Sequence, residues 1–420
     1  MIHFRQLKNG TSAILETVEN TDIVSVGFWY RHGSRDETAS ERGFAHFLEH
    51  MLFKGTEKRT AFQIAQVIDR VGGFLNAFTE KELTCLFCTL PREYIELAIE
   101  VITDMVNNSV LITEDIEKEK LVVISEIKSI EDNPEERAYE LYLETMWKGH
   151  PLSRRITGES KNIKKINREN LYAFYKKCFV PSNSVVTVAG KFDPEAVFDL
   201  LEKYRNNSTS NRLEQIRTPP VNETAWKFKK NNSHQVYIYT GLSTAPPHKL
   251  EDHYKILFFS TIFGESMSSR LFQQLREKEG LCYSVFSFRT YYSDTNLWSI
   301  YANTVPDLAS RVIKSIDHEL KRLHSEPPTE KEVSDAKGQL RGNLILSKED
   351  MESRMKRLLR QYIITGKVLE HEESLSLLKK VTAVDMQEIV KQFIKSDLFS
   401  MLAYGNKRLK KYSPGGFNFG

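Results

Sequence analysis

The sequence has little cysteine, no long hydrophobic run and no excess of one charge. Four cysteines in 420 residues are too few for a small disulfide-stabilised scaffold. No apolar run approaches the roughly 18–20 residues that a membrane-spanning helix needs, and the first residues lack the apolar core of a signal peptide. The net charge is only +3, so no broad basic field favours nucleic acid. We therefore expect a cytoplasmic protein without a nucleic-acid or membrane partner.

The sequence does contain an internal repeat. Pro91 and Pro306, which each precede an amphipathic run, are 215 positions apart. Gly190 and Gly405, which each close a short apolar strand, are also 215 positions apart. Two units of about 200 residues fit the usual range of domain sizes. We predict a first domain over 1–212, a polar linker over 213–225 and a homologous second domain over 226–420.

Each half reads as strands, then helices, then a closing strand. Alternation of apolar and polar residues predicts strands over 12–16, 23–30, 74–78 and 83–90. Helical spacing predicts helices over 44–54 and 61–71. Strands grouped apart from helices indicate an α+β fold, with a mostly antiparallel sheet flanked by helices in each domain, rather than a Rossmann sheet.

The chemistry is concentrated in the first of these helices. His46 and His50 stand one helical turn apart on one face, and two imidazoles so placed can bind one Zn²⁺. Glu49 lies near the same face and could reach a water molecule in the site. Every other residue over 44–52 is apolar, so the helix is expected to be buried, with polar groups that need a shared partner. The alternative is a coincidental H-x-x-E-H pattern.

A catalytic zinc site needs a third protein ligand from elsewhere in the chain. The candidates are Glu119 and Glu126, which are seven residues apart and so share one face of a predicted helix beginning near Thr113. Spacing alone does not choose between them. Both could equally belong to a solvated acidic face, which is the usual explanation of helix carboxylates.

These segments together resemble the pitrilysin/insulinase family of zinc metallopeptidases, in particular small two-domain bacterial members similar to mitochondrial processing peptidase. The resemblance implies one Zn²⁺ per chain on His46, His50 and Glu126. It also implies that Glu49 acts as the general base. Glu119 would not bind the metal itself but would orient one of the metal ligands. The segment 72–79 resembles the family strand whose edge takes up extended substrate. Its candidate substrate contacts are Asn76 and Phe78.

A segment of the second half, 269–285, resembles another signature of this family. The resemblance implies that Arg276 and Tyr283 bind the substrate backbone and stabilise the reacting carbonyl. Without it, the two residues would read as a helix-surface arginine and a strand tyrosine. The second half has no H-x-x-E-H pattern.

The resemblance also implies a function and a partner. Full-length relatives close a clamshell from four such domains, so a two-domain chain implies a homodimer in which Arg276 and Tyr283 act on the partner's zinc site. The implied activity is a zinc metalloendopeptidase that hydrolyses unfolded peptides or presequences, held as an added β-strand in a closed chamber. The alternative is a non-proteolytic or heterodimeric scaffold subunit of the same family.

Overall fold

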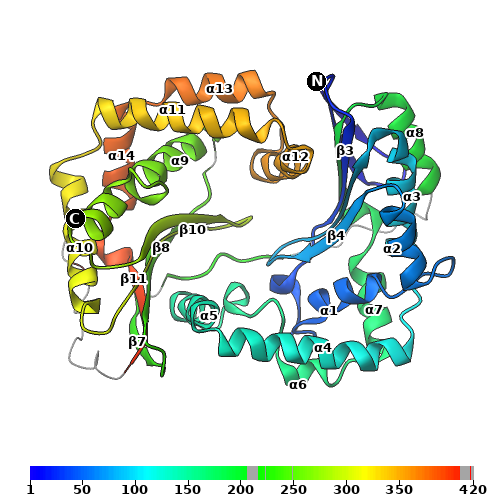
Figure 1. The fold of residues 1–420 in the computed structure, drawn as a ribbon, viewed down its shortest axis with the longest axis horizontal. Helices are drawn as coiled ribbons and strands as arrows, with labels where there is room; N and C mark the ends of the chain where they lie inside the picture. Colours follow the sequence, from blue (N-terminus) through cyan, green and yellow to red (C-terminus); the bar gives the residue numbers. More distant parts are fainter. Residues whose placement is uncertain (206–215, 223, 248, 407–416, 418–420) are drawn as a thin grey trace. The chain divides into compact units, whose positions relative to one another are not determined.

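The computed structural model describes residues 1–205, 216–222, 224–247, 249–406 and 417 (Figure 1). Contacts divide the chain into two compact units. The described residues of unit 1 fall within Met1–Lys128, Arg154–Arg217 and Ile345–Glu370, and those of unit 2 within Ser129–Ser153, Thr218–Leu344 and His371–Gly420. The predicted domain limit at 212 lies outside the described residues, so this boundary stays a prediction.

Unit 1 is built on a six-stranded mixed sheet in the order β1-β2-β6-β3-β5-β4. The strands are β1 Ile2–Gln6, β2 Ser12–Thr17, β3 Ile23–Tyr30, β4 Phe74–Thr79, β5 Thr84–Pro91 and β6 Ser184–Gly190. Strands β2 and β6 pair in parallel, and the other neighbours are antiparallel. Sequence patterning found all of these strands except β1, a short edge strand with exposed residues. The order places β4 at one edge of the sheet.

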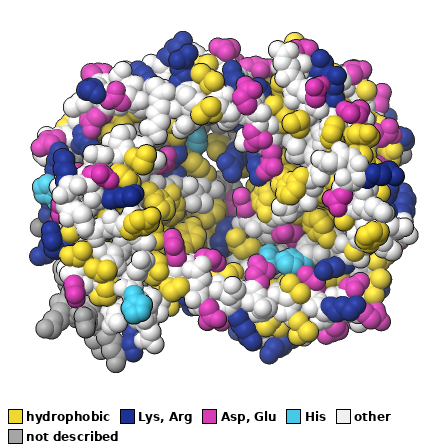
Figure 2. Space-filling model, viewed as in Figure 1, with side chains coloured by type: hydrophobic (Ala, Val, Ile, Leu, Met, Phe, Trp, Pro, Cys, Tyr) yellow, Lys and Arg dark blue, Asp and Glu magenta, His cyan; other side chains and the backbone are white. Residues whose placement is uncertain are grey.

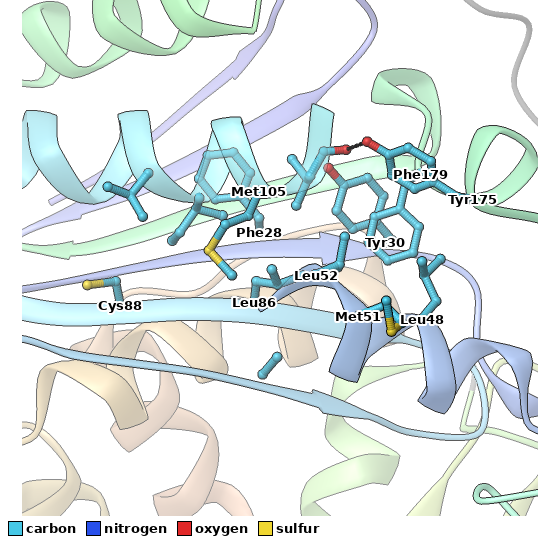
Figure 3. Packing of buried hydrophobic residues seen from close by; sticks show 14 of the residues in the cluster. Phe28, Tyr30, Leu48, Met51, Leu52, Leu86, Cys88, Met105, Tyr175 and Phe179 are labelled. Atoms are coloured by element: carbon cyan, nitrogen blue, oxygen red, sulfur yellow. Dashed lines mark hydrogen bonds between the residues drawn. The ribbon is translucent and has the colours of Figure 1, made fainter. Parts of the chain in front are cut away.

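One face of this sheet carries the main hydrophobic core of unit 1. The helices that contribute to it are α1 Phe44–Leu52, α2 Ala61–Asp69, α3 Ile95–Asn108, α4 Thr113–Asp132, α6 Ser160–Ile163, α7 Arg168–Cys178 and α8 Pro194–Tyr204. Figure 3 shows Leu48, Met51 and Leu52 of α1 beside the sheet residues Phe28 and Leu86. Because this apolar side is buried, the polar residues of α1 must emerge on its other side.

Unit 2 repeats this topology without a counterpart of β1. Its five-stranded sheet has the order β7-β11-β8-β10-β9, again with one parallel pair, β7 and β11. The strands are β7 Trp226–Lys230, β8 Val236–Thr244, β9 Ser284–Tyr291, β10 Asn296–Thr304 and β11 Ser400–Gly405. The helices are α9 Leu250–Gly264, a π-helix Phe272–Lys278, α10 Ala309–Ser325, α11 Glu330–Ser347, α13 His371–Lys380 and α14 Ala383–Phe393. Two mostly antiparallel sheets flanked by helices confirm the predicted α+β fold.

One helix of each half of the sequence belongs to the unit formed mainly by the other half. Helix α5 (Pro134–Met146) packs on the unit 2 sheet, where Tyr142 stacks on Tyr239. Helix α12 (Met351–Thr365) packs on the second face of the unit 1 sheet, where Met355 joins a cluster with Trp29. The two helices follow equivalent elements, α4 and α11, so the exchange is reciprocal. Each half of the sequence therefore needs the other half to cover its sheet.

A buried ion cluster holds α12 on unit 1. The Glu16 carboxylate on β2 is 1% exposed. Its Oε1 is 2.7 Å from Arg354 Nη1, and its Oε2 is 3.1 Å from Arg357 Nη2. Glu16→Gln would leave both half-buried guanidinium groups without this negative partner, so we expect it to lower the unfolding free energy by about 3 kcal/mol, the lower end of the range for a broken buried pair. Chemical denaturation measures this, with exposed Glu19→Gln as the control. Equal midpoints for the two variants would contradict it.

The cysteines are structural. All four are free and buried. Cys88 packs in the main core of unit 1 and Cys85 packs with Trp29 on the other face, as expected for residues three apart on a strand. Burial raises the pKa of the Cys88 thiol to about 12, so the thiol is unreactive at neutral pH. Among the described residues, no helix combines the length and apolar character needed to cross a membrane.

Candidate metal centre

Helix α1 presents two histidines to one site. It begins after Gly43, whose φ of +91° is a left-handed conformation that glycine adopts without strain. The imidazole rings of His46 and His50 have centroids 4.6 Å apart. His46 is buried and His50 is half-buried. The predicted i, i+4 pair therefore lies on one face of the helix.

Helix α4 adds a carboxylate to this pair. Glu126 Oε1 lies 3.5 Å from His46 Nε2, and Glu126 Oε2 lies 3.8 Å from His50 Nε2. Over the part of the chain that the structure describes, these three residues are the one set of potential metal ligands whose donor atoms lie within 4.8 Å of one another. Figure 2 shows histidine beside acidic side chains at the surface over α1.

The donor set fits zinc. Ligand atoms about 2.0–2.1 Å from a tetrahedral zinc ion lie about 3.4 Å from one another. The two nitrogen–oxygen distances, 3.5 and 3.8 Å, are close to that separation. Two imidazoles and one carboxylate also leave a fourth position open, as catalytic zinc sites require. The hydrogen bond with His46 lowers the pKa of Glu126, which keeps the carboxylate ionised as a ligand must be.

Glu119 lies next to a different ring nitrogen of His50 from the one that Glu126 faces. Its Oε1 is 2.8 Å from His50 Nδ1, and its Oε2 is 2.5 Å from Lys54 Nζ. Burial opposes ionisation of Glu119, but the hydrogen bonds from His50 and Lys54 prevail and lower its pKa. The same hydrogen bond with Glu119 raises the pKa of His50. Because Glu119 is hydrogen-bonded to His50 Nδ1, the other ring nitrogen, Nε2, points towards Glu126.

Glu49 is held by a residue that the sequence pattern did not single out. Thr79, at the end of β4, donates a hydrogen bond from its Oγ1 to Glu49 Oε2 over 2.6 Å. The strand therefore fixes the direction of the Glu49 carboxylate. A threonine at the end of a strand is common, and only the packing of α1 against β4 reveals this contact. Lys54 was missed for the same reason, since its partner Glu119 is far away in the sequence.

The two predicted contacts on β4 lie on the other side of the strand from Thr79. Side chains alternate along a strand, so Asn76 and Phe78 share the face opposite to Thr79. Phe78 packs edge-on against Trp29, with ring centroids 5.8 Å apart, and is half-buried. Asn76 is exposed, and its Oδ1 accepts a hydrogen bond from the Ala77 backbone at 2.8 Å. Their contact with substrate stays a prediction.

Arg276 and Tyr283 lie together in unit 2. Arg276 belongs to the π-helix, a rare element that is often found at functional sites. Its guanidinium carbon is 4.7 Å from the ring centroid of Phe272 and 5.2 Å from that of Tyr283. Tyr283, just before β9, is 75% exposed. The structure thus brings the predicted pair together and leaves the tyrosine accessible, while its role in binding stays a prediction.

Comparison with known proteins identifies the family. A family model described as "Insulinase (Peptidase family M16)" matches residues 12–160, and one described as "Peptidase M16 inactive domain" matches residues 165–340. A protein of Mycobacterium leprae named "Uncharacterized zinc protease" is 35% identical over 397 residues, covering 92% of this chain and 88% of that protein. This chain belongs to peptidase family M16.

Solved structures share this fold. A protease from Helicobacter pylori has a TM-score of 0.88 and 22% identity, over 96% of this chain and 99% of that one. A Pseudomonas fluorescens structure titled "peptidase M16 inactive domain" has a TM-score of 0.90 and 17% identity, over 97% and 98% of the two chains. The M16 model over 12–160 includes the His46, His50 and Glu126 group, whereas Arg276 and Tyr283 fall in the second match.

Proposed function

We propose that this M16 protein is a zinc-dependent metalloendopeptidase that hydrolyses unfolded peptides. The observation that carries the proposal is the convergence of His46, His50 and Glu126, from two helices, on one point. Glu49 projects from the same helix as the two histidines, with its carboxylate held by Thr79. Three metal ligands with an adjacent, oriented carboxylate form the arrangement that metal-assisted hydrolysis requires.

Each residue then has a defined task. Zinc on His46, His50 and Glu126 would lower the pKa of a water molecule towards ~7 and polarise the scissile carbonyl. Glu49 takes the proton of the attacking water and delivers it to the leaving amine. Thr79 keeps the Glu49 carboxylate in one orientation during both transfers. Glu119 keeps the His50 ring in the orientation that ligation needs.

The edge position of β4 supports uptake of an extended peptide. A peptide that adds to the sheet as a further strand satisfies its backbone hydrogen bonds. Its side chains then contribute little to recognition. Asn76 and Phe78 on this strand are the proposed contacts. Arg276 and Tyr283 would hold the substrate backbone and stabilise the oxyanion of the reacting carbonyl.

The alternative is a scaffold subunit without activity. The described residues of α9, which takes the place of α1 in unit 2, include one histidine, His253, and no H-x-x-E-H pattern. The second half therefore fits the inactive-domain description of its family match. The first half contains every residue of the proposed metal centre together with Glu49, which favours the peptidase. Metal analysis and a quenched-peptide assay with a chelator control test this: a folded chain that binds zinc without chelator-sensitive hydrolysis would support the scaffold.

We further propose that the working peptidase is a homodimer in which Arg276 and Tyr283 act on the partner's zinc site. Neither Glu49→Gln chains nor Tyr283→Phe chains should then hydrolyse peptide well alone. Random mixing of the two would create one complete site in each mixed dimer and restore about a quarter of wild-type activity. The assay is peptide hydrolysis after dissociation and reassociation of the two variants. If mixing restores nothing beyond the sum of the two variants, the trans arrangement is wrong.

A further inference from the structure

The two histidines of the proposed site are held in different ways. His50 is oriented through its Nδ1 by the Glu119 carboxylate at 2.8 Å. The Nδ1 atom of His46 is buried and has no hydrogen-bond partner among the described residues. Ligating histidines usually gain their orientation from a partner on the second ring nitrogen. The position of His46 must therefore depend on the backbone of α1 and on packing.

The backbone just before His46 is held by a buried carboxylate, Glu37. Glu37 Oε2 accepts a hydrogen bond from the Gly43 N–H at 2.9 Å, and Glu37 Oε1 accepts one from the Ala45 N–H at 2.8 Å. These donors belong to the first turn of α1, where N–H groups have no partner within the helix. Gly43, at the N-cap position, has no side chain to satisfy them. Glu37 performs the capping from six residues upstream.

Glu37 is itself firmly embedded. Its side chain is 4% exposed, and burial raises its pKa. The N–H groups of Ala45 and Gly43 act in the opposite direction, because they donate to both oxygens and so favour the ionised carboxylate. Its backbone carbonyl accepts a hydrogen bond from Arg154 Nη1 at 2.6 Å. A negative group at a helix N-terminus is also favoured by the helix dipole. The carboxylate thus connects the start of α1 to a buried part of unit 1.

The loop between Glu37 and α1 is fixed on the same scaffold. Asn162 Nδ2 donates to the carbonyls of Ala39 at 2.8 Å and Ser40 at 3.1 Å. A Cβ at Gly43 would lie 2.7 Å from the Thr157 carbonyl oxygen, so the helix start is packed closely against the neighbouring segment. The Glu41 backbone carbonyl also accepts a hydrogen bond from the Phe44 N–H at 2.8 Å. The entry of the chain into α1 therefore has little freedom, and Glu37 provides the two side-chain hydrogen bonds to the helix start.

We propose that Glu37 is the positioning residue for His46. Glu37 acts through the backbone at the start of α1, whereas Glu119 orients His50 by contacting its ring directly. The two hydrogen bonds of Glu37 fix the first turn of α1. His46 directly follows Ala45 in this turn, so the position of His46 depends on that backbone. Glu37 touches neither the metal ligands nor the substrate, so its effect is on the geometry of the site. The inference rests on the proposed function, because it assumes that His46 is a metal ligand.

Glu37→Gln tests the inference with the full chain. The amide keeps the size of the side chain but places an NH₂ group against one of the two N–H donors. We expect the affinity for Zn²⁺, measured by competition with a chelating dye, to fall about 10–100-fold. We also expect the visible spectrum of the Co²⁺-loaded protein to change, since it reports ligand geometry, which a loss of stability alone does not alter. Glu37→Asp, one methylene shorter, should lie between wild type and Glu37→Gln.

Glu41→Gln is the matched control in the same loop. Its carboxylate accepts a hydrogen bond from the Thr38 N–H and pairs with Lys177, without contact to the α1 backbone. Zn²⁺ affinity and the Co²⁺ spectrum should equal those of wild type. Unchanged affinity or an unchanged spectrum in folded Glu37→Gln would overturn the inference, as would unchanged values in Glu37→Asp if Glu37→Gln does not fold. A wild-type chain that fails to bind Zn²⁺ would instead contradict the proposed function.

Discussion

Glu49→Gln should abolish peptide hydrolysis while zinc remains bound. Glutamine has nearly the size of glutamate and can still accept the Thr79 hydrogen bond, so the site should keep its shape. It cannot take up a proton at neutral pH. Loss of a general acid–base group lowers rates by about 10²–10⁴-fold, and we expect a loss near the upper end because Glu49 serves both proton transfers.

The measurement is kcat on a quenched peptide together with the zinc content of the same sample. Glu57→Gln is the control, because Glu57 is an exposed glutamate that follows the same helix. Wild-type kcat in a zinc-loaded Glu49→Gln sample would remove Glu49 from the mechanism. Loss of zinc together with activity would place Glu49 among the ligands instead.

Glu126→Gln should remove zinc itself. The substitution leaves two imidazoles and replaces an ionised ligand by a neutral amide, which is a poor zinc ligand. We expect a larger loss of affinity than the about 10–100-fold caused by changing a residue that only supports a ligand. Hydrolysis should disappear at zinc concentrations that saturate the wild type.

Two comparisons make this prediction specific. Glu119→Gln should weaken zinc binding less than Glu126→Gln, because Glu119 contacts His50 Nδ1 rather than the point where the three donor atoms meet. Glu117→Gln, on an exposed part of the same helix, should leave zinc binding unchanged. A greater loss in Glu119→Gln than in Glu126→Gln would show that the third ligand was assigned to the wrong glutamate.

Local patterns in the sequence were sufficient to predict much of the fold and of the candidate metal centre. The apolar face of α1 and the i, i+4 pair depend on helical periodicity, which is a property of neighbouring residues. The repeat predicted two sheets of one topology, because equivalent strands recur at a nearly constant spacing. The resemblance of short motifs to a family then assigned roles that periodicity alone left open, in particular the choice of Glu126 over Glu119.

Other features depend on contacts between distant segments and were beyond such patterns. Thr79, Lys54 and Glu37 look ordinary in the sequence, and each gains its importance from a partner in another element. The exchange of α5 and α12 was equally hidden, since an amphipathic helix does not reveal which sheet it will cover.

By itself, then, the sequence determined the α+β class, the repeat and the helix that carries His46, Glu49 and His50. Periodicity did not determine where the two glutamates of α4 lie relative to the histidines, and tertiary structure did. The two glutamates share a face and differ by about 10 Å along the helix axis, and only the packing of α4 beside α1 sets Glu126 between the histidines and Glu119 behind His50. The physical reason is that periodicity fixes the direction of a side chain around a helix, whereas packing fixes its position along the neighbouring helix.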